Sequence, residues 1–182
     1  KIGIFEIRYY GLVYALGFLI AYLTLRRNKR KLKITENQIE GLIISIMVGL
    51  LIGARVFYFI SSDFYTLLHA PWELIFIWQG GMAFFGGLVG VICAGLIYLK
   101  RHKLKPSFLQ LADILILPVT FFLFLGRLAN FINGELVGIP SDVAWCVVFP
   151  LYDNFCRHPY QLYAALSHLV LFVILLVVAG RS

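Results

Sequence analysis

The sequence carries little charge for its length. Only 14% of its 182 residues are charged, whereas 61% are hydrophobic, and the mean hydropathy is +0.88. Soluble globular domains are about one-quarter charged. A soluble domain of this size could not bury so much apolar surface. The shortage of charge therefore excludes an ordinary soluble fold and indicates an integral membrane protein.

Residues that bind metals are also few and dispersed. The three cysteines are not spaced as zinc ligands are. The four histidines are likewise far apart: His69, His102, His158 and His168. We therefore expect no metal site and no cofactor. Cys146 and Cys156 lie in one hydrophilic loop, where an oxidising compartment would permit a disulfide, and the sequence leaves open whether they are bridged or free.

Five long apolar segments account for the high hydropathy. A helix needs about 20 apolar residues to cross the hydrocarbon layer. The segments are residues 9–25, 39–60, 82–99, 109–125 and 161–179. We therefore expect an all-α fold, a polytopic membrane helix bundle of about five transmembrane helices. Residues 1–182 are then a single integral membrane domain.

The connections between these segments differ in character. Residues 134–160 are the one long hydrophilic excursion, and we expect a small extracytoplasmic cap there, with a strand at residues 143–149. Residues 72–78 are amphipathic and too short to span, and their two tryptophans favour the headgroup region or a re-entrant loop. Thr35 is expected to cap the second helix.

The positive charges are unevenly distributed along the chain. Residues 61–80 contain no lysine or arginine, whereas ten of the sixteen such residues lie in two short loops. These ten are Arg26, Arg27, Lys29, Arg30, Lys31, Lys33, Lys100, Arg101, Lys103 and Lys105. The positive-inside rule places both loops in the cytoplasm, so residues 1–8, 61–80 and 126–160 face the outside. A basic surface for nucleic acid is the weaker interpretation, and we expect no nucleic-acid partner.

A polar cluster follows the fourth apolar segment, in the run GRLANFINGELVG at residues 126–138. An arginine, two asparagines and a glutamate at the edge of the hydrocarbon layer need partners, because bulk water is absent there. On a helix, Arg127, Asn130 and Gly134 would share one face. The run resembles the signature G-R-x-[GA]-N-F-x-N-x-E-x-x-G of the prolipoprotein diacylglyceryl transferase family at every defined position.

Four further blocks of the sequence resemble blocks of the same family, and they occur along the chain in the order that the family has. They are YYG at residues 9–11, GARVFY at 53–58, WQGGMAFFGGLVG at 78–90 and RHPYQLY at 157–163. Four positions depart from the family pattern: Arg8 and Phe85 stand where it has histidine, Tyr160 where it has serine, and Ala164 where it has glutamate. The family continues with two more spans. The chain begins at Lys1 without methionine and stops at Ser182 directly after a span, so we expect trimmed ends and a C-terminally shortened member.

The resemblance implies an enzyme of a bacterial-type cytoplasmic (inner) membrane, with its active site toward the outer leaflet. It would transfer a diacylglyceryl group from phosphatidylglycerol to the lipobox cysteine of a prelipoprotein signal peptide, forming a thioether. The expected catalytic residues are Arg127, Glu135 and Tyr10. The expected substrate-binding residues are Asn130, Asn133, Gly138, Arg55, Arg157, His158 and Gln161. A single cavity is expected to bring Arg127, Asn130, Glu135 and Gly138 together, with Tyr10 and Arg55 contributing.

Two alternatives remain open at this point. Arg55 lies deep in its apolar segment, and a structural ion pair with Glu73 or Asp63 would explain it without any substrate. The whole chain could also be a catalytically degenerate phospholipid-binding or transport protein of the same fold. The lack of an inverted repeat counts against transport, whereas Phe85 counts against catalysis because phenylalanine cannot transfer a proton.

Overall fold

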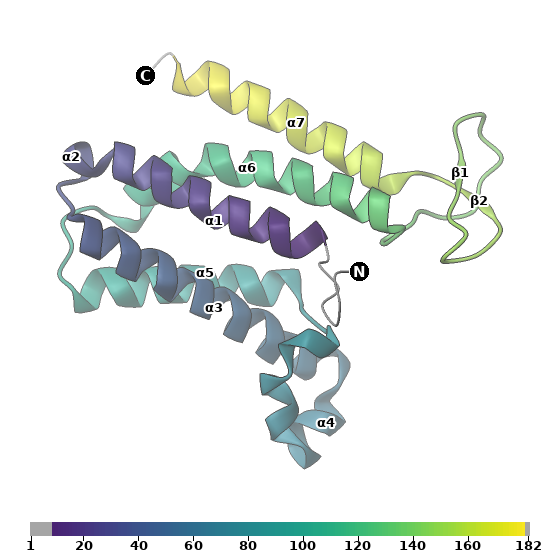
Figure 1. Cartoon of the computed structure of the whole chain (residues 1–182), viewed down its shortest axis with the longest axis horizontal. Coiled ribbons are helices and arrows are strands. Elements are labelled where there is room, and N and C mark those ends of the chain that lie inside the picture. Colours follow the sequence, from purple (N-terminus) through teal and green to yellow (C-terminus); the bar gives the residue numbers. More distant parts are fainter. Residues whose placement is uncertain (1–8, 181–182) are drawn as a thin grey trace, which may run out of the picture. The chain divides into compact units, whose positions relative to one another are not determined.

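The computed structural model describes residues 9–180, and nearly all of its regular structure is helical (Figure 1). The elements in chain order are α1 (Tyr9–Arg27), α2 (Lys29–Leu32), α3 (Glu36–Ser62), α4 (Phe64–His69), the 3₁₀ helices η1 (Pro71–Ile75) and η2 (Ile77–Gln79), α5 (Phe84–Arg101), α6 (Phe108–Asn133), β1 (Val147–Val148), β2 (Cys156–Arg157) and α7 (Tyr160–Ala179). The expected all-α membrane helix bundle is confirmed.

Four helices of the described chain are long and apolar enough to cross a membrane: α3, α5, α6 and α7. At most 22% of the residues in their most apolar windows are buried inside the protein. The apolar side chains that remain exposed would be unfavourable in water and are suited to lipid. The chain is therefore a multi-pass membrane protein. The first expected span, residues 9–25, coincides with α1, which is not among these four, so this span stays a prediction.

The chain divides into two compact units, and the division falls inside α1 and inside α6. One unit is Tyr22–Ala112, which holds α3, α4, η1, η2 and α5. The other contains the chain up to Ala21 and from Asp113 onward, with most of α1 and α6, the two strands and α7. Each unit is described by itself.

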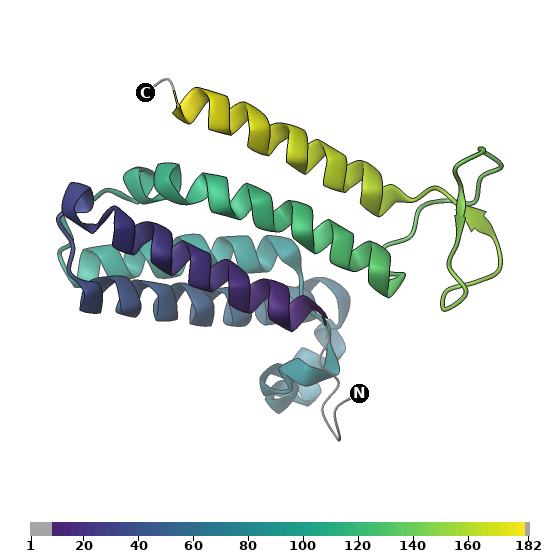
Figure 2. The ribbon, with the colours of Figure 1, turned by 45° about the horizontal axis from the view of Figure 1, so that its top comes forward.

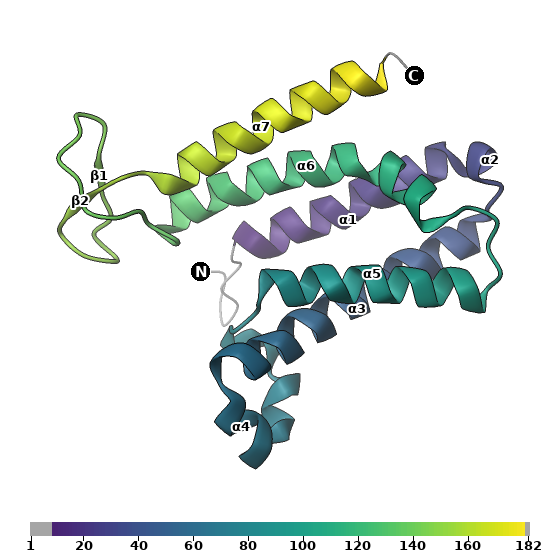
Figure 3. The same ribbon diagram turned by 180° about the vertical axis from the view of Figure 1, so that it is seen from behind.

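Glycines allow α3 and α5 to pack backbone to backbone along their length (Figures 2 and 3). A Cβ on Gly90 would overlap the carbonyl oxygen of Gly49, and one on Gly53 would overlap that of Gly86. Lipid supplies little hydrophobic drive between spans, so such close approach is a main source of their attraction. Gly41 lies against Tyr98 at the other end of the pair, so the two helices are antiparallel.

This antiparallel arrangement places both basic loops at the same end of the α3–α5 pair. The first loop leads through α2 into α3, which begins with a capping box at Thr35, as expected for its N-cap. Glu36 in the first turn accepts hydrogen bonds from Lys29 at 2.5 Å and Arg26 at 3.4 Å. The second loop follows the end of α5. Residues 61–80, which lack positive charge, connect the opposite ends.

The connection from α3 to α5 consists of short helical turns. The amphipathic segment expected at residues 72–78 forms η1 and η2, with Pro71 in the first turn of η1. Trp72 and Trp78 are 59% and 69% exposed. A position in the headgroup region stays a prediction, which these exposed tryptophans support.

In the other unit, α6 extends eight residues beyond the apolar segment expected to end at residue 125. The extension ends in a Schellman motif: the amides of Gly134 and Glu135 donate to the carbonyls of Phe131 at 3.1 Å and Asn130 at 2.9 Å. Gly134 has φ +67°, a left-handed conformation that glycine adopts at little cost. The expectation that Gly134 shares a helix face with Arg127 and Asn130 is therefore wrong, because Gly134 terminates the helix.

Residues 134–160 form a small loop structure beyond the ends of α6 and α7 (Figure 1). The strand expected over residues 143–149 is much shorter, since only Val147–Val148 pairs with Cys156–Arg157. The reason is a turn in which the Cys146 amide donates to the Val143 carbonyl at 3.0 Å. A disulfide joins Cys146, the residue before β1, to Cys156 in β2. We call residues 134–160 the cap.

Replacing Gly90 by alanine is expected to destabilise the α3–α5 pair. The new Cβ would meet backbone atoms of α3, which cannot move aside as a side chain can. Overpacking of this kind costs about 1–3 kcal/mol. The matched variant is Gly126→Ala, because a Cβ there meets nothing within 4 Å. Thermal unfolding in detergent should show a lower Tm for Gly90→Ala alone, and equal Tm values would contradict the packing.

Candidate functional site

The last turns of α6 carry the polar residues of the sequence motif. Asn130 is only 6% exposed, and Arg127 is half-buried one turn before it on the same helix face. Arg127 makes no hydrogen bond or ion pair to any residue that the structure describes. A guanidinium near the end of an apolar helix is thus left available for a ligand. Asn133, the last residue of α6, is also half-buried and has no side-chain hydrogen bond within the described chain.

The Schellman turn folds Glu135 back toward Asn130. The Asn130 amide Nδ2 lies 3.5 Å from the Glu135 carboxylate, at the outer limit of a hydrogen bond. The backbone carbonyl of Glu135 accepts a 2.6 Å hydrogen bond from Gln161 Nε2, in the first turn of α7. Gln161 therefore fastens α7 to the turn after α6. Gln161 is fully buried and already donates to this carbonyl, so its expected substrate-binding role stays a prediction that this internal contact does not favour.

Arg55, in α3, binds main chain and not a carboxylate. Its Nη2 donates to the carbonyl oxygens of Glu73 at 2.8 Å and Phe76 at 2.9 Å. Its Nη1 donates to Gly81 at 3.1 Å and also to Gly80. The alternative of a structural ion pair with Glu73 or Asp63 is therefore wrong, because carbonyl dipoles of η1 and of the residues that follow it stabilise the guanidinium instead.

These contacts give Arg55 a structural task. The side chain is 4% exposed, and the Phe59 ring lies 4.8 Å from its guanidinium carbon. Only Nε of the guanidinium has no partner within the described chain. A lipid phosphate would have to displace carbonyl groups already bound there, so headgroup binding by Arg55 stays a prediction that these contacts do not favour.

The cap is organised around Arg157, one of the expected substrate-binding residues. Arg157 Nε donates to both Asp153 carboxylate oxygens, at 3.0 and 3.1 Å, and Nη1 donates to the Gly138 carbonyl at 2.9 Å. The Gly138 amide donates to the His158 carbonyl at 3.2 Å. A Cβ at residue 138 would overlap that same carbonyl, which explains the glycine on packing grounds alone. Substrate contacts by Arg157 and Gly138 stay predictions.

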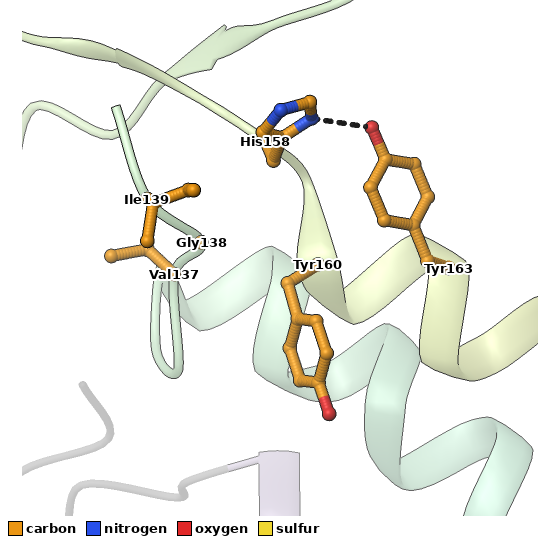
Figure 4. A pocket seen from close by; sticks show the side chains of 6 residues that line it. All are labelled: Val137, Gly138, Ile139, His158, Tyr160 and Tyr163. Atoms are coloured by element: carbon orange, nitrogen blue, oxygen red, sulfur yellow. Dashed lines mark hydrogen bonds between the residues drawn. The ribbon is translucent and has the colours of Figure 1, made fainter. Parts of the chain in front are cut away.

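A hollow of about 460 Å³ lies where the cap meets α7 (Figure 4). It is lined by Val137, Gly138, Ile139, His158, Tyr160 and Tyr163. Of the expected site residues, it therefore includes Gly138 and His158. Sequence reasoning gave no role to Tyr163, although it closes the RHPYQLY block, or to Trp145, the one tryptophan of the cap. Trp145 Nε1 donates to the Tyr163 hydroxyl at 2.6 Å.

The remaining expected site residues are not joined into one cavity by the described contacts. Tyr10 lies in the first turn of α1, and its side chain is outside the described part of the structure. Phe85, in the first turn of α5, is 69% exposed. A single void shared by Arg127 and Tyr10 stays a prediction. Among the described residues, no three histidines, cysteines or carboxylates gather as metal ligands do.

The sequence matches, over residues 1–182, the family model described as prolipoprotein diacylglyceryl transferase. It is similar to curated relatives named phosphatidylglycerol–prolipoprotein diacylglyceryl transferase. The one from Geobacter sulfurreducens is 44% identical, covering 100% of this chain and 70% of the relative. Those from Allorhizobium ampelinum and Legionella pneumophila strain Lens are 42% and 38% identical, with 100% of this chain matched and 66% and 71% of the relatives.

The ion pair that holds the cap together should make it sensitive to acid. The hydrogen bond from Arg157 lowers the pKa of Asp153. The stabilisation is therefore complete above the ordinary carboxyl pKa of about 3.9 and is lost as the pH falls through the lower folded value. Amide exchange of residues 138 and 158, followed by mass spectrometry, should lose protection below about pH 4.

Two variants check this assignment. Asp153→Asn should lower the protection at neutral pH and abolish its acid dependence. Asp142→Asn is the matched control, because Asp142 is an exposed carboxylate of the same cap whose side chain has no hydrogen bond within the described chain. If both variants behave like the original protein, the Asp153–Arg157 pair does not stabilise the cap.

Proposed function

Because this chain belongs to the prolipoprotein diacylglyceryl transferase family, we propose that it transfers a diacylglyceryl group from phosphatidylglycerol to the lipobox cysteine of a prelipoprotein. The observation that carries the proposal is the contrast between two arginines. Arg55 is occupied by four carbonyls, whereas half-buried Arg127 has no partner among the described residues. A phosphate is the ligand that such a paired-donor cation recognises best.

In the proposed reaction, the cysteine sulfur attacks a carbon of the diacylglyceryl group. The attacked carbon is the one bonded to the phosphate ester oxygen. The carbon–oxygen bond breaks, its electron pair leaves with glycerol phosphate, and the thioether forms. Arg127 would stabilise the negative charge that grows on the leaving phosphate. Asn130 and Asn133 would orient its oxygens or those of the glycerol.

The thiol must lose its proton, because the thiolate is the reactive form. Glu135 is the carboxylate in the turn that ends α6. Its side chain is exposed and has one weak contact, to Asn130. We assign Glu135 the role of accepting the proton, and Tyr10 a supporting role in the same site. Phe85 stands where the family pattern has histidine, and phenylalanine cannot accept a proton. Glu135 would therefore accept the thiol proton without a histidine at residue 85.

We also propose that the site faces the outer leaflet of a bacterial-type cytoplasmic membrane. Both basic loops lie at one end of the α3–α5 pair, which the positive-inside rule assigns to the cytoplasm. The helix α6 begins just after the second basic loop, and its 26 residues are long enough to carry Arg127 to the opposite side. The cap disulfide supports this orientation, since disulfides persist in oxidising compartments.

Cysteine labelling should establish this orientation. With the native cysteines replaced by serine, Ser62→Cys should react with a membrane-impermeant maleimide added to intact cells, and Lys103→Cys should react only after lysis. The reason is that the two positions lie at opposite ends of the α3–α5 pair. Protection of residue 62 together with labelling of residue 103 would show that the orientation is inverted.

Replacing Arg127 should abolish most of the transferase activity. Arg127→Gln is expected to lower the rate of thioether formation by about 10²–10³-fold, as the loss of one preorganised oxyanion partner does elsewhere. Arg127→Lys should recover only part of the rate, because an ammonium cannot donate in the paired geometry. The assay follows transfer from labelled phosphatidylglycerol to a lipobox peptide in proteoliposomes.

The matched control is Arg101→Gln, which removes an exposed arginine of the second basic loop, at the end of α5. It should leave the rate within about twofold, since an exposed charge contributes little. Full activity of Arg127→Gln would overturn the assigned role. Binding of phosphatidylglycerol without any transfer by the original chain would favour the lipid-binding alternative.

A further inference from the structure

Three aromatic side chains at the junction of the cap and α7 form one hydrogen-bonded chain. The indole Nε1 of Trp145 donates to the Tyr163 hydroxyl oxygen at 2.6 Å. That hydroxyl lies 3.0 Å from Nδ1 of His158, the bond drawn as a dashed line in Figure 4. All three residues belong to the same compact unit. The proposed reaction gives this row of hydrogen bonds no role.

Mutual polarisation of the two hydrogen bonds favours one direction for the bond between Tyr163 and His158. An indole can only donate, so Trp145 occupies one lone pair of the Tyr163 oxygen. If His158 Nδ1 carried a proton, the Tyr163 oxygen would accept twice, and its own hydrogen would have no acceptor among the described residues. If the Tyr163 hydroxyl donates to Nδ1, its oxygen accepts one bond and donates the other, the two bonds polarise each other in the same sense, and the proton of His158 on Nε2 stays free for a ligand.

We propose that Trp145 and Tyr163 are positioning residues that hold neutral His158 with its proton on Nε2. With Nδ1 already accepting, neutral His158 has only an N–H donor to offer a ligand. His158 then serves as a hydrogen-bond donor to an oxygen of the lipid substrate and not as the base that activates the thiol. The identity of the ligand rests on the proposed function, whereas the tautomer does not.

The surroundings of His158 fit this ligand. The backbone is fixed on both sides, since the His158 amide donates to the Ile139 carbonyl at 3.1 Å and its carbonyl accepts from Gly138. The adjoining hollow is lined by apolar Val137 and Ile139 and by the Tyr160 ring (Figure 4). A largely apolar hollow beside a neutral N–H donor suits the glycerol and ester region of a phospholipid better than a free, fully hydrated anion.

Nitrogen NMR of the protein in nanodiscs distinguishes the two tautomers of His158 directly. We expect ¹⁵N-histidine spectra at neutral pH to show protonated Nε2 and unprotonated Nδ1 for His158, assigned by the loss of its signals in His158→Gln. Tyr163→Phe should populate both tautomers, and Trp145→Phe should weaken the preference. Tyr160→Phe is the control, since the Tyr160 hydroxyl has no hydrogen bond within the described chain. Protonated Nδ1 in the original protein, or no change in Tyr163→Phe, would overturn the proposal.

Ligand binding and kinetics test the donor role. Adding phosphatidylglycerol to phosphatidylcholine nanodiscs should shift the Nε2–H signal. An equal shift with inorganic phosphate would exclude the lipid as the specific ligand. Tyr163→Phe should raise the KM for phosphatidylglycerol by about three- to tenfold, the worth of one hydrogen bond, with little change in kcat. A kcat lowered by about 10²-fold or more at unchanged KM would show that His158 acts in proton transfer and would overturn the assignment.

These measurements separate the two proposals. If the original protein shows no transfer at all, the proposed function fails, while the NMR tautomer and the lipid-induced shift still decide the role of His158. If transfer is normal but the tautomer is reversed, only the inference about Trp145 and Tyr163 fails.

Discussion

The cost of leaving a polar group unpartnered in hydrocarbon governs how this chain is built. Arg55 meets that cost by binding four main-chain carbonyls of the segment between α3 and α5. The connection formed by η1, η2 and the glycines after them is thereby given a fixed path, because four of its carbonyls converge on one cation. Arg127 has no such partner among the described residues. A cation left unpaired at this position is understandable if a charged substrate occupies it.

Close backbone approach is the second constraint, and glycine satisfies it in two different settings. Between α3 and α5, Gly49 and Gly90 let two spans touch where lipid offers little hydrophobic drive. In the cap, Gly138 lets the backbone after α6 lie against the His158 backbone. The same residue type thus supports helix association in one compact unit and the cap in the other. Neither position requires a direct chemical role for the glycine.

The polar residues of the family motif divide into those that build the site and those that remain free to act. Gln161 and Arg157 are committed to holding the turn after α6 and the cap. Arg127 and Asn133 keep their polar groups available within the described chain. This division is what a preorganised site requires, because donors aimed at a substrate lose less on binding when their supports are already fixed.

The sequence alone determined the membrane class, the helical architecture and the family, because these depend on hydrophobic length, charge distribution and motif order along the chain. It also predicted the N-cap at Thr35, which is a local hydrogen bond. It could not determine that Arg55 binds carbonyls and not Glu73 or Asp63, since backbone acceptors have no signature in side-chain identity. The end of α6 at Gly134, the disulfide left open between Cys146 and Cys156, and the Trp145–Tyr163–His158 chain were decided only by tertiary structure, because each depends on which distant groups the fold brings within bonding distance.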